Sequence, residues 1–598
     1  MKRILQVLAD LWQRMLVTFA RFPLTIICLL GAVSLIFYLI ANGGGLQSLD
    51  MMVQKLMFTF LLGAFLGVTA QFLCERFAPV ARRRLLVYLL SLLLIGGYFL
   101  ILYPAAGISF EVSIRTFVAV FAMFCAFIWL PSFKGKFDFN LSALIHLKAA
   151  LVSLLYAAVL AIGSAAILAG IDILLFDISS DSYAYLMTII WVFFAPVYYL
   201  SLLPHFNSDL GTHREAAAEA SHYPGFLEIL VSYIAIPLAA VYTMVFAAYF
   251  LKILVTFKWP AGQLGGMVLA YAAAGLIIYI LASPLENRFA ALYRRLFPFF
   301  LIPIVIMQLI SVGIRLNAYG ITESRYYVAS FGLFSLVCGV LLIFKPVKRN
   351  GVIAVLAGLL AIASVVPPLD AFSVSRRSQI NRLETMLTAE GMLQEGAIKA
   401  RADAPEELRI EVTNILQYLN SRDYIKYVAW LPDEFDPYRK MKDTFGFESA
   451  YRDSGVDGGY FYLTSESGEP YVVSGYDIIY NHYSYNGGEK VTNKDFTIEG
   501  QNYEFVLHRT SPLELFIEVI DGNGQVLVST GLYEFIQPLL PDSQSRKKDI
   551  TDIDTMTAEV EADGYKLRVV FQSINGYVGN DQEQRIDYEV IVLFGVPR

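Results

Sequence analysis

The feature that most constrains this chain is a series of apolar runs, each long enough to cross a lipid bilayer as a helix. A hydrocarbon core of about 30 Å needs about 20 apolar residues of α-helix. Eleven such runs lie in the first 368 residues, and they cover 23–41, 56–74, 85–103, 114–131, 149–171, 185–203, 225–251, 264–283, 297–314, 327–344 and 351–368. The sequence therefore predicts an all-α polytopic bundle of about eleven transmembrane helices over residues 1–368, embedded in a lipid bilayer.

Charge and cysteine content exclude several other classes of protein. Asp, Glu, Lys and Arg make up only 16% of the chain, whereas soluble globular proteins carry about 25%. The four cysteines all lie inside apolar runs, at Cys28, Cys74, Cys125 and Cys338. A disulfide framework or a thiolate metal site is therefore not expected in the rest of the chain.

The positions of the basic residues predict how the bundle is oriented. Lys and Arg are enriched in the short loops on the cytoplasmic side of a membrane protein. With the basic first segment placed inside, the cytoplasmic loops carry eighteen Lys and Arg. The loops on the other side carry four, or six with the edge residues Arg115 and Lys252. An odd number of spans then leaves everything after residue 368 outside. We predict a multi-pass protein of the cytoplasmic (inner) membrane, with a cytoplasmic N-terminus and an extracytoplasmic C-terminal domain.

Beyond residue 368 the chain becomes acidic and its hydrophobic period changes. This part carries 22 basic and 38 acidic residues. Nucleic acid is not an expected partner, because phosphate binding needs basic patches. Helical periodicity predicts a helical linker region over 369–430, with helices at 373–396 and 405–421. A period of two follows and predicts a β-rich domain over 431–598.

Turn chemistry indicates that the strands of this domain are antiparallel. Asp521-Gly522 and Asp563-Gly564 are typical of tight hairpin turns, as is the run Asn486-Gly487-Gly488. The predicted strands cover 459–464, 470–474, 495–499, 503–508, 514–520, 525–529, 557–561, 565–572 and 585–594. The tyrosine-rich stretch 476–485 either packs in the core of this domain or forms an exposed contact surface. The whole chain is therefore predicted to be a helical membrane bundle followed by an α+β domain, rich in antiparallel strands, outside the cytoplasm.

Few ionisable residues lie within the apolar runs, and such residues are candidates for function. Arg115 lies near the outer end of the fourth run, and Asp172 lies near the outer end of the fifth. Because consecutive spans are antiparallel, we expect the two side chains at similar depth. They form either a structural ion pair or the charged pair of a gate or binding site.

The connection between the ninth and tenth runs is the most distinctive segment of the chain. It reads Arg315-Leu-Asn-Ala-Tyr-Gly-Ile-Thr-Glu-Ser-Arg325-Tyr-Tyr. Gly320 permits a tight turn, and Glu323 suits the first turn of the next helix. Together with Arg115 and Asp172, the polar residues of this segment are predicted to build a cluster on the outer face. They are Arg315, Asn317, Tyr319, Glu323, Arg325 and Tyr326.

The pattern R-x-N-x-Y-G-I-T-x-x-R-Y-Y in this connection resembles that of bacterial multi-pass membrane proteins known as domain-of-unknown-function family 4153. The segment Ser378-Gln-Ile-Asn-Arg-Leu and the basic first segment are also similar to that family. The resemblance covers most of residues 1–430. It implies a polytopic membrane protein of bacteria and implies no reaction.

The sequence contains no established motif for metal or cofactor binding, so no cofactor and no metal are expected. Three histidines lie in the loop 204–224, at His205, His213 and His222. Their spacings of eight and nine residues match no established ligand pattern. The β-rich part also lacks a nucleophile elbow.

Three functions are compatible with these patterns. The first, which we favour, is a non-enzymatic envelope protein whose membrane bundle displays an outer domain. That domain would sense or bind another envelope protein or a cell-wall component. The second is a transporter or channel with a polar site near the outer ends of spans 4, 5, 9 and 10. The third is a membrane enzyme acting on a phosphate-bearing lipid-linked substrate, with arginines holding the phosphate.

Overall fold

The computed structural model describes most of the chain and divides it into two compact units. The described residues are 13–42, 51–105, 107–135, 138–206, 218–257, 264–432, 434–451, 459–465, 473–484, 491–539, 548–578 and 585–597. Unit 1 comprises Met1–Ala450, and unit 2 comprises Tyr451–Arg598. The predicted turn at Asn486, most of the predicted strand 470–474 and His213 lie outside the described residues.

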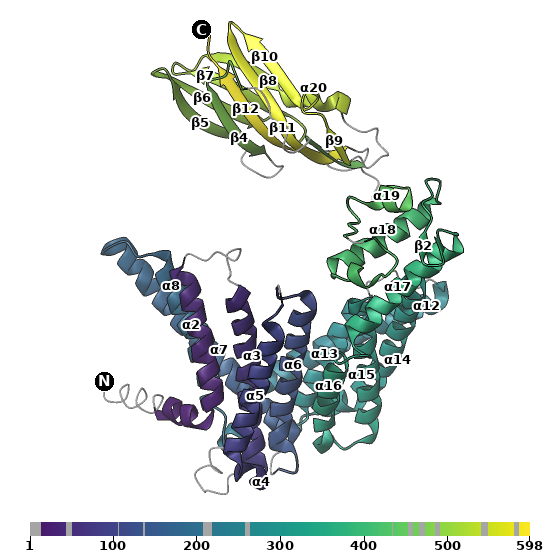
Figure 1. The fold of residues 1–598 in the computed structure, drawn as a ribbon. Helices are drawn as coiled ribbons and strands as arrows, with labels where there is room; N and C mark the ends of the chain where they lie inside the picture. The colour runs from purple at the N-terminus through teal and green to yellow at the C-terminus, as the bar shows by residue number, and fades with distance from the viewer. Residues whose placement is uncertain are drawn as a thin grey trace. The chain divides into compact units, whose positions relative to one another are not determined.

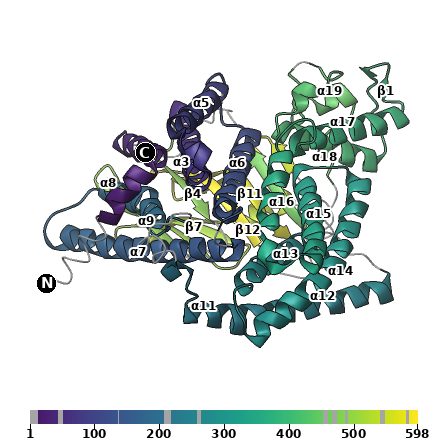
Figure 2. The same ribbon diagram turned by 90° about the horizontal axis from the view of Figure 1, so that it is seen from below.

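Unit 1 begins with long apolar helices that stand side by side, as Figures 1 and 2 show for α3, α5, α6 and α13 to α16. The helices of this bundle are α2 (Pro23–Ala41), α3 (Met51–Arg76), α4 (Ala78–Ala81), α5 (Arg84–Leu102), α6 (Phe110–Trp129), α7 (Phe139–Leu174), α8 (Ser180–Thr188), α9 (Ala195–Ser201), α11 (Gly225–Ile229), α12 (Ile236–Thr256), α13 (Leu264–Ala282), α14 (Arg288–Tyr319), α15 (Glu323–Phe344) and α16 (Gly351–Ala363). Two π-helical segments, η3 (Ile189–Phe194) and η4 (Leu230–Ala235), each lie just before a proline. Proline removes a backbone donor and distorts the helix around it.

Ten helices of the described residues are long and apolar enough to cross a membrane, rather than the eleven that the sequence predicted. Each of the first ten predicted runs overlaps one of these helices, and three of them, 85–103, 185–203 and 264–283, extend one or two residues beyond it. The eleventh run, 351–368, forms only the 13-residue helix α16, which ends at Ala363. Its early end has a steric cause, because the ring of Pro367 would clash with the Ala363 carbonyl if the helix continued.

Although α16 is short, the chain from Gly351 to Val365 runs antiparallel along the length of α6. Contacts fix this register at three levels, since Gly351 lies against Trp129, Gly358 lies against Ala122 and Cys125, and the Val365 carbonyl accepts a hydrogen bond from Arg115. Fourteen residues of helix rise about 21 Å. The segment therefore covers the same depth of the bundle as residues 115–129 of α6.

The remainder of unit 1 is a small helical region, here called the collar (residues 371–447). It contains α17 (Ala371–Ala389), the hairpin of β1 (Leu393–Gln394) and β2 (Ala397–Ile398), α18 (Glu406–Ser421) and α19 (Met441–Phe445). Its apolar core includes Leu383, Leu416 and Phe445, all fully buried. The helix predicted at 405–421 corresponds to α18. The helix predicted at 373–396 corresponds to α17 only as far as Ala389, because Gly391 lies in a turn and Leu393–Gln394 form β1.

Unit 2 is a sandwich of two β-sheets. Its strands are β3 (Gly459–Ser465), β4 (Ile478–Ser484), β5 (Val491–Ile498), β6 (Gln501–Arg509), β7 (Leu515–Asp521), β8 (Val526–Gly531), β9 (Lys548–Thr551), β10 (Thr557–Ala562), β11 (Tyr565–Val578) and β12 (Arg585–Gly595). One sheet has the order β4-β12-β11-β3-β9, with β10 also paired to β11, and the other has the order β5-β6-β7-β8. Side chains from both sheets fill one core, among them Phe505 and Ile517 from one and Phe571 and Val590 from the other.

The prediction of a helical bundle followed by an antiparallel β domain is confirmed, and the details differ in two strands. All described pairs are antiparallel except β3 with β9, which is parallel. Neither β9 nor β4 was predicted as a strand. Residues 478–484 of the tyrosine-rich stretch form β4, in which exposure alternates along the strand. Aliphatic residues are few there, so its period of two was not recognised.

Candidate functional site

The polar residues predicted as one cluster are distributed over four helices of unit 1. Arg115 lies on α6 and Asp172 on α7, while the others lie on α14, α15 and the turn between them. The turn residues gather where α14 and α15 meet the collar. Asp172 contacts none of these residues in the described structure. Its carboxylate instead accepts the backbone N–H of Ile178 at 2.5 Å, in the connection between α7 and α8.

Arg115 is held by two carboxylates, neither of which is Asp172. Its Nη2 lies 2.6 Å from Glu111 Oε1, one turn earlier on α6, and 3.1 Å from Asp370 Oδ1. Its Nη1 donates to the Val365 carbonyl, and its guanidinium lies 5.0 Å from the centre of the Phe372 ring. Arg115 thus joins α6 to the segment that connects α16 with α17.

Asp370 is the fully buried partner in this arrangement. Its Oδ1 also accepts the backbone N–H groups of Phe372 and Ser373 at 3.2 and 3.1 Å, and so caps the N-terminus of α17. The side chain is 0% exposed. A carboxylate buried to this extent is stable only when charge and hydrogen bonds compensate it, and Arg115 is the cation that does so.

Glu323, in the first turn of α15, is the second buried acid at this end of the bundle. Its two oxygens accept hydrogen bonds from the collar, from Tyr418 Oη at 2.7 Å and from Tyr424 Oη at 2.9 Å. Arg422 Nε lies 3.7 Å from Glu323 Oε2. Burial, followed by the charge of Glu323, raises the pKa of both phenols well above the usual value, so both remain protonated and donate.

The turn between α14 and α15 contacts the beginning of α17. Ser378 Oγ accepts the Ile321 N–H at 2.9 Å, and Gln379 Nε2 donates to the carbonyls of Tyr319 and Ile321 at 3.0 Å each. Gly320 has φ +69°, and a Cβ there would lie 2.8 Å from Gln379 Nε2. The turn therefore requires glycine, and the two segments that carry the family resemblance touch each other.

Two arginines from two helices lie against the ring of Tyr319 at this turn, and a third lies one helical turn before it on α14. The guanidinium groups of Arg325 and Arg382 lie 5.5 and 5.9 Å from the centre of its ring. Arg325 Nη1 donates to the carbonyls of Tyr319 and Gly320 at 3.0 and 2.9 Å. Arg315 lies on α14 four residues before Tyr319, on the same side of the helix. Tyr326 donates to the Leu369 carbonyl at 2.7 Å, and Asn317 is exposed.

Sequence reasoning missed the residues that these predicted side chains contact, namely Asp370, Arg382, Tyr418 and Tyr424. Arg382 had a signal, because it belongs to the segment Ser378-Gln-Ile-Asn-Arg-Leu. Asp370 also had one, because an Asp just before a helix is a preferred N-cap. The two tyrosines had none, since they reach Glu323 from about 100 residues further along the chain.

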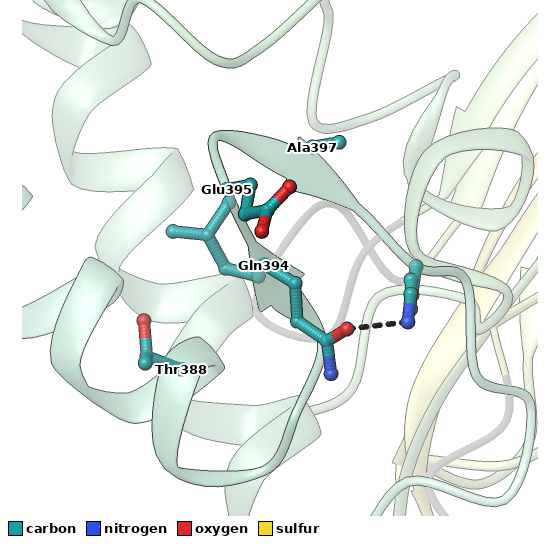
Figure 3. A pocket seen from close by; sticks show the side chains of 6 residues that line it. Thr388, Gln394, Glu395 and Ala397 are labelled. Atoms are coloured by element: carbon teal, nitrogen blue, oxygen red, sulfur yellow. Dashed lines mark hydrogen bonds between the residues drawn. The ribbon is translucent and has the colours of Figure 1, made fainter.

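A separate hollow lies at the other end of α17, beside the β1–β2 hairpin (Figure 3). It measures about 750 Å³ and is lined by Thr388, Leu393, Gln394, Glu395, Ala397 and Lys399. Lys399 Nζ donates to Gln394 Oε1 across it. The hollow is wide open and its polar groups bond to one another, so we assign it no chemistry.

The described residues contain no group of three His, Cys, Asp or Glu side chains that could hold a metal ion. Within that part of the chain, the chemistry at the junction of bundle and collar is that of ion pairs and charge-assisted hydrogen bonds. Such groups position helices and attract anions. They do not by themselves supply a nucleophile and its base.

The profile of a family described as "Domain of unknown function (DUF4153)" matches residues 25–403. An uncharacterized protein of Pasteurella multocida (strain Pm70) is 23% identical over 275 residues, which are 46% of this chain and 46% of that protein. The chain thus spans about half the length of this curated relative. No solved structure matches the chain.

Proposed function

Since the chain belongs to the DUF4153 family of multi-pass membrane proteins, we propose that its bundle serves to display unit 2 outside the cytoplasm. In this proposal the protein lies in the cytoplasmic membrane and is not an enzyme. The collar connects the last membrane segment to unit 2. Unit 2 binds another protein of the envelope.

The register between α6 and the 351–365 segment is the observation that carries this proposal. Gly351 lies at the Trp129 end of α6, and Val365 lies at the Arg115 end. If α6 crosses the membrane, a segment that matches it end to end crosses as well. Ten long helices plus this short one make an odd number of crossings, so the basic loops then place the collar and unit 2 outside.

The junction supports display because it fixes the collar to the bundle. The contacts Arg115–Asp370, Glu323–Tyr418 and Gln379–Ile321 come from α6, α15 and the turn before α15. Three buried anchors on different elements restrict the collar far more than a flexible linker would. A fixed collar gives the chain that leads into unit 2 a firm attachment to the bundle.

Paired reporter fusions on either side of α16 test the topology. One fusion follows Arg349, between α15 and α16, and the other follows Arg598. Each carries either green fluorescent protein, which fluoresces when folded in the cytosol, or alkaline phosphatase, which is active only outside it. We expect fluorescence alone at Arg349 and phosphatase activity alone at Arg598.

The two positions act as controls for each other, because they differ by only the α16 crossing. Fluorescence at both positions would mean that the segment containing α16 does not cross the membrane. The collar and unit 2 would then be cytoplasmic, and the proposal of outward display would be wrong.

The binding face of unit 2 is proposed to include the outer side of β4. This strand ends the order of its sheet among the described strands, and strands in that position can accept a further strand from a partner. Ile479 is 52% exposed on it, whereas Ile478 packs against the core.

These adjacent isoleucines provide a matched test in living cells. A photoreactive amino acid at Ile479 is expected to crosslink a partner protein, while the same group at Ile478 should react within unit 2. The adducts are measured by the shift in mass on a gel and by mass spectrometry. Equal intermolecular adducts at both positions, or none at Ile479, would exclude this face as the binding surface.

A further inference from the structure

The arginines around Tyr319 carry more positive charge than the neighbouring acids neutralise. Arg382 is paired with Glu411, whose Oε2 lies 2.8 Å from its Nη2. Arg325 bonds to two carbonyl oxygens, which carry no net charge. Arg315 has no ion-pair partner among the described residues. Two of the three positive charges are therefore left without an acid.

The nearest buried acid cannot supply the missing charge. Glu323 lies two residues before Arg325, but both of its oxygens accept hydrogen bonds from Tyr418 and Tyr424, and Arg422 is its ion-pair partner. Arg325 and Arg382 lie against the same ring, and Arg315 lies one helical turn before that ring on α14. Like charges are rarely held together at a partly buried site without an anion to offset them.

The donors that remain on these side chains suit an anion with several oxygens. In the described part of the chain, Arg325 uses only Nη1 and Arg382 uses only Nη2 for hydrogen bonds. Arg315 uses none. Arginine donates in a planar fork that matches the oxygens of phosphate. The ring of Tyr319, which is 38% exposed, lies against two of the guanidinium groups and leaves their edges available.

The location of the turn indicates where such an anion would come from. Helices α14 and α15 are both candidate membrane spans, and the turn joins their ends. Lipid headgroups lie at this depth on either side of a bilayer, so the argument holds whichever side the turn faces. Tyr319 and Tyr326 at this level are typical of residues at the membrane boundary.

We propose that Arg315, Arg325 and Arg382, arranged around Tyr319, form a binding site for the phosphate of an anionic membrane lipid. The lipid would neutralise the charge that the protein leaves uncompensated. It would also link α14, α15 and α17 through one headgroup. No bond is made or broken in this role.

Binding of fluorescent phosphatidylglycerol to the full chain in a neutral detergent tests the proposal. The main variant is R315Q, because Arg315 makes no hydrogen bond or ion pair in the described structure and its loss should not affect folding. The control is R377Q, which removes an exposed arginine from α17. Because R315Q removes a charge-assisted hydrogen bond to the phosphate, we expect it to weaken binding about tenfold or more and R377Q to leave binding unchanged.

Two further arms separate the possible outcomes. R325K keeps the charge and should retain more affinity than R325Q, and phosphatidylcholine should bind more weakly than phosphatidylglycerol. Inorganic phosphate should not displace the lipid at equal concentration. Displacement by phosphate without any lipid preference would overturn the lipid assignment, and equal binding by R315Q and R377Q would overturn the site itself.

Discussion

Replacing Arg115 with Met is expected to destabilise the junction of bundle and collar by about 4 kcal/mol, since breaking a buried ion pair on one side costs about 3–5 kcal/mol. The methionine fills similar space but leaves Asp370, which is 0% exposed, without a cation. One oxygen of Asp370 already lacks a hydrogen-bond partner among the described residues. The remaining oxygen would be held only by the two backbone N–H groups of α17.

Amide hydrogen exchange of the peptide 364–375 measures this effect in the full chain. If local opening governs exchange, about 4 kcal/mol corresponds to roughly a thousandfold faster exchange, because each 1.4 kcal/mol is tenfold. Peptides of unit 2 serve as the internal control and should not change.

A double-mutant cycle separates the ion pair from the packing of Arg115. D370N retains an N-cap for α17 and is expected to be milder than R115M. The double variant R115M/D370N should be more stable than R115M alone, because it removes the buried charge that R115M leaves behind. If the effects of the two substitutions simply add, Arg115 and Asp370 are not coupled and the junction is held by other contacts.

The membrane bundle was predictable because lipid imposes a length and a composition on every helix that crosses it. The first run, 23–41, coincides with α2 residue for residue. The eleventh run shows the limit of this reasoning. Its residues are apolar to 368, but the backbone geometry of Pro367 ends the helix at Ala363, so a count of apolar residues overstates its length.

The candidate site was predictable only where its residues are close together in the sequence. The turn from Arg315 to Tyr326 was recognised from its glycine and its charges, and the structure brings most of these residues together. Arg115 was paired with Asp172 because the two lie on consecutive spans. The structure instead pairs Arg115 with Asp370, 255 residues away, and no local pattern specifies a contact of that range.

Replacing Glu323 with Ala is expected to destabilise the contact between the collar and α15 by about 3 kcal/mol, because each buried group left without a partner costs about 1–3 kcal/mol. The hydroxyls of Tyr418 and Tyr424 would lose their acceptor, and Arg422 would lose its counter-ion. The control is E406A, which removes an exposed glutamate from the first turn of α18. It should change stability by less than about 0.5 kcal/mol.

Trypsin cleavage within 371–421 of the folded full chain reports the release of the collar. For E323A we expect cleavage about a hundredfold faster than for the unchanged chain, in proportion to the open population. E323Q should lie between the two, because its amide keeps one acceptor oxygen. The decisive comparison adds Y418F and Y424F to E323A, which removes the hydroxyls that lost their acceptor. Recovery of resistance to trypsin would show that unpaired buried hydroxyls opened the junction, whereas no recovery would assign the anchoring to Arg422 and the charge of Glu323.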